Sequence, residues 1–85
     1  MRKKVIFELS AFEDLQNWFR ADLQTYFKIV NIVKKLETSS ANIIKQSQPL
    51  KKELIGYYCC KIDDENRLVY KITDTTIFIA SCKYY

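Results

Sequence analysis

The spacing of apolar residues changes at Pro49, the single proline of this 85-residue chain. Before Pro49 the apolar residues recur every three or four positions, as on the buried side of a helix, and after it they alternate with polar residues, as on a strand. Helices followed by strands predict an α+β domain, in which a two-helix hairpin packs on one face of a twisted, mainly antiparallel sheet. A chain of this length has room for one such core, so we expect a single domain over residues 1–85.

The first half of the chain is expected to form one short strand and two helices. The apolar residues 5–7 predict the strand. Ser10 and Glu13 have the spacing of a capping box, which predicts that the first helix begins at Ser10. Asp22 is expected to cap the second helix, and the polar residues 38–48 predict a loop after it. The large apolar residues at helical spacing, which we expect to be buried, are Phe12, Leu15, Trp18, Phe19, Leu23, Tyr26, Phe27, Ile29, Val30, Ile32, Val33 and Leu36.

The second half is expected to form four strands joined by short turns. Gly56 and two polar interruptions of the alternating pattern predict the turns, at residues 56, 63–66 and 74–76. Tight turns between neighbouring strands predict an antiparallel meander. The complete order is then β-α-α-β-β-β-β, with the last four strands at residues 50–55, 57–62, 67–73 and 77–85.

Alternation along these strands separates two kinds of side chain. The even positions carry no charge and are expected to face the helices: Tyr58, Cys60, Ile62, Leu68, Tyr70, Ile72, Phe78, Ala80, Cys82 and Tyr84. The odd positions gather cations and tyrosines on the opposite, open face: Tyr57, Cys59, Lys61, Arg67, Lys71, Ser81, Lys83 and Tyr85. A cationic face with interleaved rings suits single-stranded RNA or DNA, because phosphates pair with cations and bases stack on rings. An ordinary solvent-facing sheet has the same composition, and the pattern alone does not choose between the two.

Composition restricts the class of protein further. Lys and Arg outnumber Asp and Glu by 14 to 10, and the resulting net charge of +4 favours an anionic partner. No apolar run approaches the ~18 residues that cross a membrane, so a cytoplasmic protein without a membrane partner is expected. The chain has no histidine, and its three cysteines, two of them adjacent, match no metal-binding pattern. We therefore expect buried free thiols, no metal site and no cofactor.

Short motifs in the second half resemble a known family. Three of them are Pro49-Leu50-Lys51, Arg67-Leu68-Val69-Tyr70 and Cys82-Lys83-Tyr84, and they follow one another in the family's spacing without a gap. They resemble the second half of the YoeB/Txe toxins, which belong to the RelE/ParE superfamily of bacterial toxin–antitoxin modules. The first half agrees more loosely, at Phe12, Glu13, Asp14 and Trp18. The chain is therefore identified as a member of that family, and a RelE-like fold is expected.

The resemblance implies a ribosome-dependent mRNA interferase, an endoribonuclease that cuts mRNA in the ribosomal A site and so inhibits translation. In such toxins the ribose 2′-OH attacks the adjacent phosphate, which needs a base, a cation for the phosphate and an acid for the departing 5′-oxygen. The implied partners are the ribosome, mRNA and a cognate antitoxin, and a homodimer stays open. Arg67 matches the family's catalytic arginine. The residues expected to hold RNA or the ribosome are Lys51, Lys61, Lys71, Lys83 and Tyr84.

Two departures from the family pattern bear on this chemistry. Gln48 stands where the family has a glutamate, the expected base, and an amide cannot accept a proton near neutral pH. The family ends Tyr-His-Tyr, whereas this chain ends Tyr84-Tyr85. Either Tyr85 replaces the histidine, or it is the terminal tyrosine and the histidine has been dropped. Our hypothesis is that Tyr85, with a pKa lowered by neighbouring cations, acts as acid or base, that Arg67 stabilises the transition state and that Gln48 positions the substrate.

Two other interpretations stay open. A family member that binds antitoxin and ribosome without cleaving mRNA would be consistent with the loss of the Glu–His pair. A ParE-like inhibitor of DNA gyrase would share the fold, but Arg67 and the C-terminal motif fit the YoeB/Txe pattern better.

Overall fold

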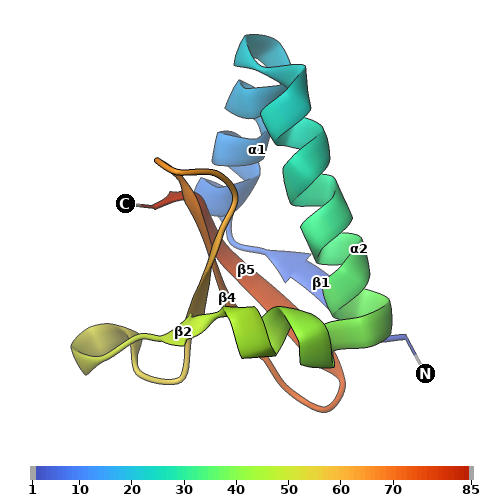
Figure 1. Ribbon diagram of the computed structural model, residues 1–85, viewed down its shortest axis with the longest axis vertical. Helices are drawn as coiled ribbons and strands as arrows, with labels where there is room; N and C mark the ends of the chain where they lie inside the picture. The colour runs from blue at the N-terminus through green and yellow to red at the C-terminus, as the bar shows by residue number, and fades with distance from the viewer. Residues whose placement is uncertain (1, 85) are drawn as a thin grey trace.

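The computed structural model describes residues 2–84 and, of Tyr84, the backbone alone. Its elements in chain order are β1 (Lys4–Phe7), α1 (Leu9–Ala21), α2 (Leu23–Gln46), β2 (Gln48–Pro49), the 3-10 turn η1 (Lys52–Leu54), β3 (Tyr58–Lys61), β4 (Arg67–Ile72) and β5 (Thr76–Tyr84). The strands form one sheet in the order β1-β5-β4-β3-β2, in which β1 runs parallel to β5 and the other neighbours are antiparallel. The hairpin of α1 and α2 covers one face of the sheet (Figure 1). The predicted α+β class and RelE-like arrangement are confirmed.

The core lies between this hairpin and the sheet face that meets it. α1 contributes Ala11, with Leu15 and Trp18 partly buried beside it. α2 contributes Ile29 and Leu36, which are fully buried. The fully buried core side chains of the sheet are Leu68, Tyr70, Ile77, Ile79 and Cys82. Burial of each large apolar side chain contributes roughly 1.5–3 kcal/mol of transfer free energy, so this layer holds both helices against the sheet. Within residues 2–84, neither helix has the length and apolarity that spanning a membrane requires.

The first helix begins earlier than the sequence predicts. α1 starts at Leu9 with Glu8 as its N-cap, and no side chain makes a capping hydrogen bond. The capping box predicted at Ser10 and Glu13 is therefore wrong. The Ser10 hydroxyl instead donates to the backbone carbonyl of Ala80 at 3.4 Å, because Ser10 lies inside the helix and faces β5.

β5 is irregular where it pairs with β4. Arg67 lies opposite Tyr84, and Tyr70 lies opposite Ile79. Between these two pairs β5 therefore contains two more residues than β4. Such bulges withdraw backbone groups from the ladder, and those groups need other partners. They also change which face of the sheet each following side chain occupies.

Three side chains of α1, spaced four residues apart, form hydrogen bonds with the backbone of the irregular part of β5. Ser10 donates to Ala80, as described above. The carboxylate of Asp14 accepts from the backbone N–H of Cys82 at 3.2 Å, and the indole of Trp18 donates to the carbonyl of Cys82 at 3.0 Å. Because residues i, i+4 and i+8 lie along one side of a helix, this row fixes α1 against the strand that leads to the C-terminus.

The same row explains why several predicted core residues are exposed. Phe12 and Phe19 are 47% and 56% exposed, since the side of α1 that carries Ser10 and Trp18 faces the sheet and theirs does not. Leu23 and Phe27 are 50% and 55% exposed on α2. The prediction that these four side chains are buried is wrong.

The turn into β5 overturns part of the predicted alternation, because it pairs the even position Ile72 with the odd position Ile77. Ile77 and Ile79 are fully buried, while Phe78 pairs with Lys71 on the face turned away from the helices. The prediction that Phe78 faces the helices is therefore wrong. Ala80 is the extra residue at one of the register shifts. On β3 and β4, which pair without a shift, the predicted alternation is confirmed.

α2 extends through most of the segment predicted to be a loop. Asp22 caps it as predicted, because its carboxylate accepts from the backbone N–H groups of Gln24 and Thr25. The helix then continues to Gln46 with one kink at Ser39, where φ is −152° and ψ is 58°. Figure 1 shows that the last turns point in a different direction from the long part of the helix. The helix persists beyond the kink because Ile43 remains buried in the core.

The strand predicted at residues 50–55 is wrong. The pairing of β2 ends at Pro49, and the chain turns through η1 before Gly56, whose φ of +96° confirms the predicted turn. Ile55 is 77% exposed, so the apolar residues here do not line a buried strand face. The turn at residues 63–66 is as predicted, since the carboxylate of Asp63 accepts from the backbone N–H groups of Glu65 and Asn66.

Candidate nucleic-acid interface

The sheet face turned away from the helices, called the open face below, is organised in cross-strand rows. The first row contains Lys61 of β3 opposite Arg67 of β4, and Arg67 pairs on its other side with the backbone of Tyr84 on β5. The second row runs across four strands through Gln48, Cys59, Val69 and Ser81. The third row places Lys71 beside Phe78, which pairs in turn with Ile6 of β1.

Arg67 begins β4, and its side chain is half-buried. Lys61, at the end of β3, is its direct partner and is exposed. Directly opposed residues of a sheet have Cβ atoms only ~5 Å apart, so two cations at these positions repel each other. This arrangement costs stability in the absence of an anion, and a bound anion between the two side chains would relieve it. The structure therefore brings together two of the residues that the sequence singles out.

Gln48 lies on the same face as Arg67 but in the neighbouring row. It pairs with Cys59 and is exposed, two strands away from β4. Two strand spacings and two residues of rise separate the Cα atoms of Gln48 and Arg67 by roughly 12 Å. Side chains as long as these can approach one ligand from two sides without touching each other.

Cys59 lies between these residues and is 6% exposed. Burial raises the pKa of its thiol, while the nearby positive charge of Arg67 acts in the opposite direction. The three cysteines are free and buried, as the sequence predicts.

Lys71 is the cation at the other end of β4. Its ammonium lies 5.6 Å from the ring centroid of Tyr57 and 5.3 Å from that of Phe78. The side chain is half-buried between the two rings. Four residues of rise place it about 13 Å from Arg67 along the strand.

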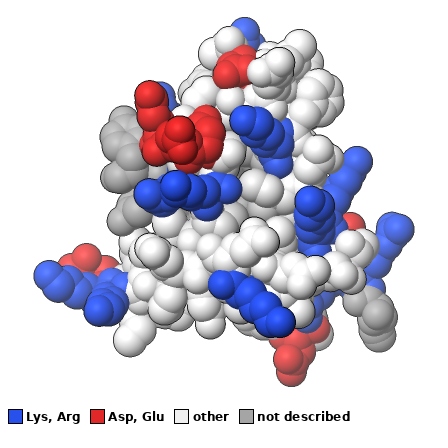
Figure 2. Space-filling model, in the orientation of Figure 1, with Lys and Arg blue, Asp and Glu red and all other residues white. Residues whose placement is uncertain are grey.

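The remaining predicted site residues lie elsewhere or cannot be placed. Lys51 is exposed and precedes η1, beyond the end of β2. Lys83 lines a cavity with Trp18 and the turn residues Asp64–Asn66, so its surroundings are acidic. The acidic side chains of this turn form a cluster on the surface (Figure 2). The side chain of Tyr84 and the whole of Tyr85 lie outside the described part of the chain.

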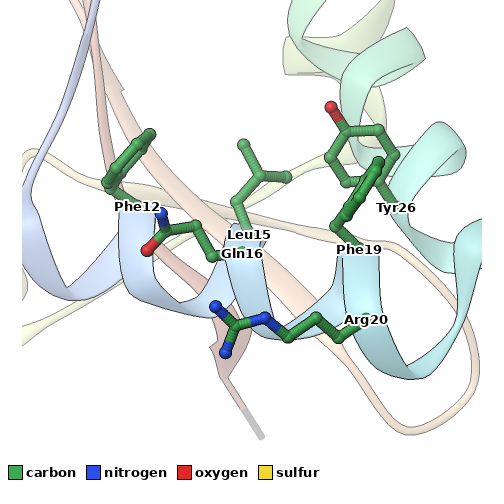
Figure 3. Close-up of a pocket in the computed structure, with 6 residues that line it drawn as sticks. All are labelled: Phe12, Leu15, Gln16, Phe19, Arg20 and Tyr26. Atoms are coloured by element: carbon green, nitrogen blue, oxygen red, sulfur yellow. The ribbon is translucent and has the colours of Figure 1, made fainter.

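A second candidate surface lies on the helical hairpin. A groove of about 380 Å³ is lined by Phe12, Leu15, Gln16, Phe19, Arg20 and Tyr26 (Figure 3). Phe19 and Tyr26 meet edge to face, with ring centroids 5.1 Å apart. Exposed aromatic rings around a shallow groove are typical of a protein-binding surface, and the single cation of the lining is Arg20. Among residues 2–84, no group of three metal-ligating side chains gathers in this groove or elsewhere.

Phe78 is the residue of the open face that the sequence pattern missed. The stretch 77–80 is apolar at every position, so alternation cannot decide which of its residues face the helices. The opposite strand held the only usable signal. Lys71 on β4 must face away from the core, and so must whichever residue of β5 pairs with it.

Comparison with known proteins identifies one family. Residues 7–85 match the family model for the YoeB-like toxin of the bacterial type II toxin–antitoxin system. The chain is 32% identical over 83 residues to Toxin YoeB of Mycobacterium bovis, covering 98% of each protein. It superposes on one chain of the YoeB dimer from Staphylococcus aureus with a TM-score of 0.85 and 34% identity, over 100% of this chain and 99% of that chain. For YoeB in its heterotetrameric complex with the antitoxin YefM, from the same organism, the TM-score is 0.84 and the identity 37%, with the same coverage.

Proposed function

The chain belongs to the YoeB-like toxins of bacterial type II toxin–antitoxin systems, and on this premise we propose that it is an endoribonuclease that cuts mRNA in the ribosomal A site. The open face of its sheet would hold the mRNA, and Arg67 would act on the phosphate that is cleaved. The toxin would then inhibit translation by destroying the message on the ribosome.

The observation that carries this proposal is the pair formed by Lys61 and Arg67 across β3 and β4. Two directly opposed cations are unfavourable in a sheet unless an anion lies near them. A phosphodiester supplies that anion, and a guanidinium suits it because it stays charged and presents a planar fork of N–H donors. Arg67 is half-buried, so its charge is screened less by solvent than that of an exposed lysine.

In the proposed reaction the ribose 2′-oxygen forms a bond to phosphorus while the bond from phosphorus to the 5′-oxygen breaks. One proton leaves the 2′-OH and one reaches the departing 5′-oxygen, so the reaction consumes no oxidant or cofactor. Arg67 would stabilise the extra negative charge on the phosphate in the transition state. Gln48, on the same face in the adjacent row, would orient the substrate through its amide, since it cannot take up a proton.

Tyr85 is our proposed acid or base. Its chain neighbour Tyr84 pairs through the backbone with Arg67. The positive charges of Arg67 and Lys61 would lower the pKa of a phenol held beside them. General acid–base catalysis of this kind contributes roughly 10²–10⁴-fold to a rate.

The second candidate function is a toxin that binds the ribosome without cutting mRNA. It is favoured by Gln48, because the expected glutamate base is absent. Toeprinting of initiated ribosomes with the purified protein distinguishes the two. A new cut in the A site supports the nuclease, a block of translation without a cut supports the binding function, and poisoning of gyrase with neither would indicate ParE-like activity.

The roles of single residues are tested in the same assay. Arg67→Gln is expected to abolish the cut and Tyr85→Phe to weaken it strongly. A Tyr85→Phe variant that cuts ribosome-bound mRNA as fast as the unchanged protein would remove Tyr85 from the mechanism and leave the role of Arg67 intact.

We also propose that an antitoxin binds this toxin, as YefM binds YoeB in the Staphylococcus aureus complex. The groove around Phe19 offers exposed apolar area for such a contact, and removal of that area from water favours association. Arg20 at the groove favours a partner segment that combines apolar and acidic residues. A homodimer formed through this groove would compete with the antitoxin for the same surface.

A further inference from the structure

We propose that Lys71, held between the rings of Tyr57 and Phe78, forms a second phosphate-binding position on the open face. It would bind the RNA strand at a nucleotide that is not adjacent to the one cleaved at Arg67. This inference rests on the proposed function, because it assigns a further contact to the same RNA.

The first observation is the confinement of the Lys71 side chain. Its ammonium lies 5.6 Å from the centroid of Tyr57 and 5.3 Å from that of Phe78. The negative faces of the rings attract the ammonium, so the flexible lysine side chain is restrained before any ligand arrives. A restrained cation loses less conformational entropy on binding than a free one, and it therefore gains more affinity from each contact.

The second observation is the charge along the two central strands. The charged residues of β3 and β4 are Lys61, Arg67 and Lys71, all cations and all on the open face. Arg67 and Lys71 are separated by roughly 13 Å along one strand. An extended polyanion that runs along β4 from the first row to the third would meet both of them.

The third observation is the apolar character of the row around Lys71. Phe78 pairs with Ile6, which is 41% exposed although it is large and apolar. Together with Tyr57, these side chains provide an apolar border beside a cation, in which Tyr57 and Phe78 are half-buried and Ile6 is exposed. Bases and sugars of a single strand can rest on such a border while the phosphate reaches the ammonium.

The test is a binding measurement with a single-stranded RNA oligonucleotide that carries 2′-O-methyl groups and cannot be cleaved. Fluorescence anisotropy from about 50 to 200 mM salt gives the affinity and its salt dependence. Lys71→Met removes the charge and keeps an apolar side chain, whereas Lys71→Arg keeps the charge. Lys34→Met is the matched control, because Lys34 is an exposed lysine on α2.

Lys71→Met is expected to weaken binding by about 3–10-fold and to lower the slope of log K against log salt by about 0.7, the value for one phosphate contact on a single strand. Lys71→Arg should retain the slope, and Lys34→Met should retain both slope and affinity. Phe78→Leu should weaken binding without changing the slope, because it removes one of the two rings that restrain the lysine but leaves its charge. Thermal unfolding confirms that each variant is folded.

The inference is overturned if Lys71→Met matches Lys34→Met in affinity and slope, or if the unchanged protein fails to bind the oligonucleotide at about 50 mM salt. Toeprinting separates this failure from failure of the proposed function. A protein that cuts on the ribosome, and whose Lys71→Met variant binds RNA as Lys34→Met does, refutes the second position alone. A protein that never cuts but binds RNA in a Lys71-dependent manner refutes the nuclease and retains the second position.

Discussion

The open face of the sheet and the outer surface of the helical hairpin expose opposite kinds of side chain. The charged residues of β3 and β4 are three cations on one face, whereas the hairpin groove is lined by aromatic and aliphatic side chains with Arg20 beside them. The two surfaces share one core, because α1 and α2 pack on the opposite side of the same strands. An anionic polymer suits the first surface and a protein segment suits the second, so substitutions on one should leave the other unaffected.

The largest effect is expected for Arg67→Gln. Loss of a charged donor to the transition state typically lowers a rate by about 10²–10³-fold, and the fold should be unchanged because the side chain is only half-buried. Cleavage of ribosome-bound mRNA, followed by primer extension, measures the change. Lys34→Gln is the control for the loss of one positive charge. Antitoxin affinity that falls as far as cleavage does would show that the two surfaces are not independent.

A substitution in the hairpin groove should weaken antitoxin binding and leave cleavage unchanged. Phe19→Asp places a charge where the groove is apolar, and it is expected to weaken antitoxin binding by about 10–100-fold. The cleavage rate should stay unchanged. Asn17→Asp introduces the same charge at an exposed position of α1 that does not line the groove. Isothermal titration calorimetry with the antitoxin distinguishes the two variants, and equal affinities would exclude the groove as the binding site.

The shared core should titrate only in the alkaline range. Burial raises the pKa of Cys60 to about 11, and that of Cys82 and Tyr70 to about 12. These groups lose their protons more readily when the chain is unfolded. Their contribution to the free energy of unfolding is therefore fully present below pH ~9 and is lost as pH rises toward the folded pKa values. The expected loss is about 1 kcal/mol per pH unit for each group that ionises.

Urea unfolding at pH 8, 9.5 and 11 measures this loss. Cys82→Ala removes one titrating group and should flatten the decline above pH ~9. A stability that stays constant up to pH 11 would contradict the burial of these groups. A decline that is already large at pH 8 would have to come from other groups, because these three are mostly protonated at that pH in both the folded and the unfolded chain.

The smallest effect is expected for Lys61→Gln. Because Lys61 directly opposes Arg67, its neutralisation should raise the free energy of unfolding by a few tenths of a kcal/mol. The same change should weaken RNA binding, so stability and function would move in opposite directions. Lys51→Gln, outside the sheet, should give no such gain in urea unfolding. A loss of stability in Lys61→Gln would mean that the two cations are not in repulsive contact.

The candidate site was predictable from the sequence as far as the regular part of the sheet extends. β3 and β4 pair without a shift, and the turn between them is closed by Asp63, so alternation placed Lys61, Arg67 and Lys71 correctly. Alternation failed at the start of β5, because the turn pairs Ile72 with Ile77 and so places odd positions of β5 on the helix side, until the extra residue Ala80 reverses this. Sequence spacing does not record which residues pair across a turn, and Phe78 was assigned to the wrong face for that reason.

The helices show a second limit of prediction from the sequence. Polar residues between Thr38 and Gln48 looked like a loop, but a helix with one exposed side can be polar over most of its length while Ile43 alone holds it to the core. Phe12 and Phe19 looked like a buried stripe, yet the side of α1 that meets the sheet is the one that bonds the bulged strand. Apolar spacing shows that a side of a helix is apolar, but not whether a partner within the same chain covers it.

The sequence by itself determined the α+β class, the helical hairpin, the cation-bearing face of β3 and β4 and membership of the toxin family. These follow from local periodicity and from motifs, which are properties of neighbouring residues. Tertiary structure alone decided that Lys61 opposes Arg67, that Lys71 lies between two rings and that the hairpin keeps an apolar groove exposed. These depend on strand register and on helix rotation, which are fixed by contacts between residues far apart in the chain, such as the hydrogen bond from Trp18 to Cys82.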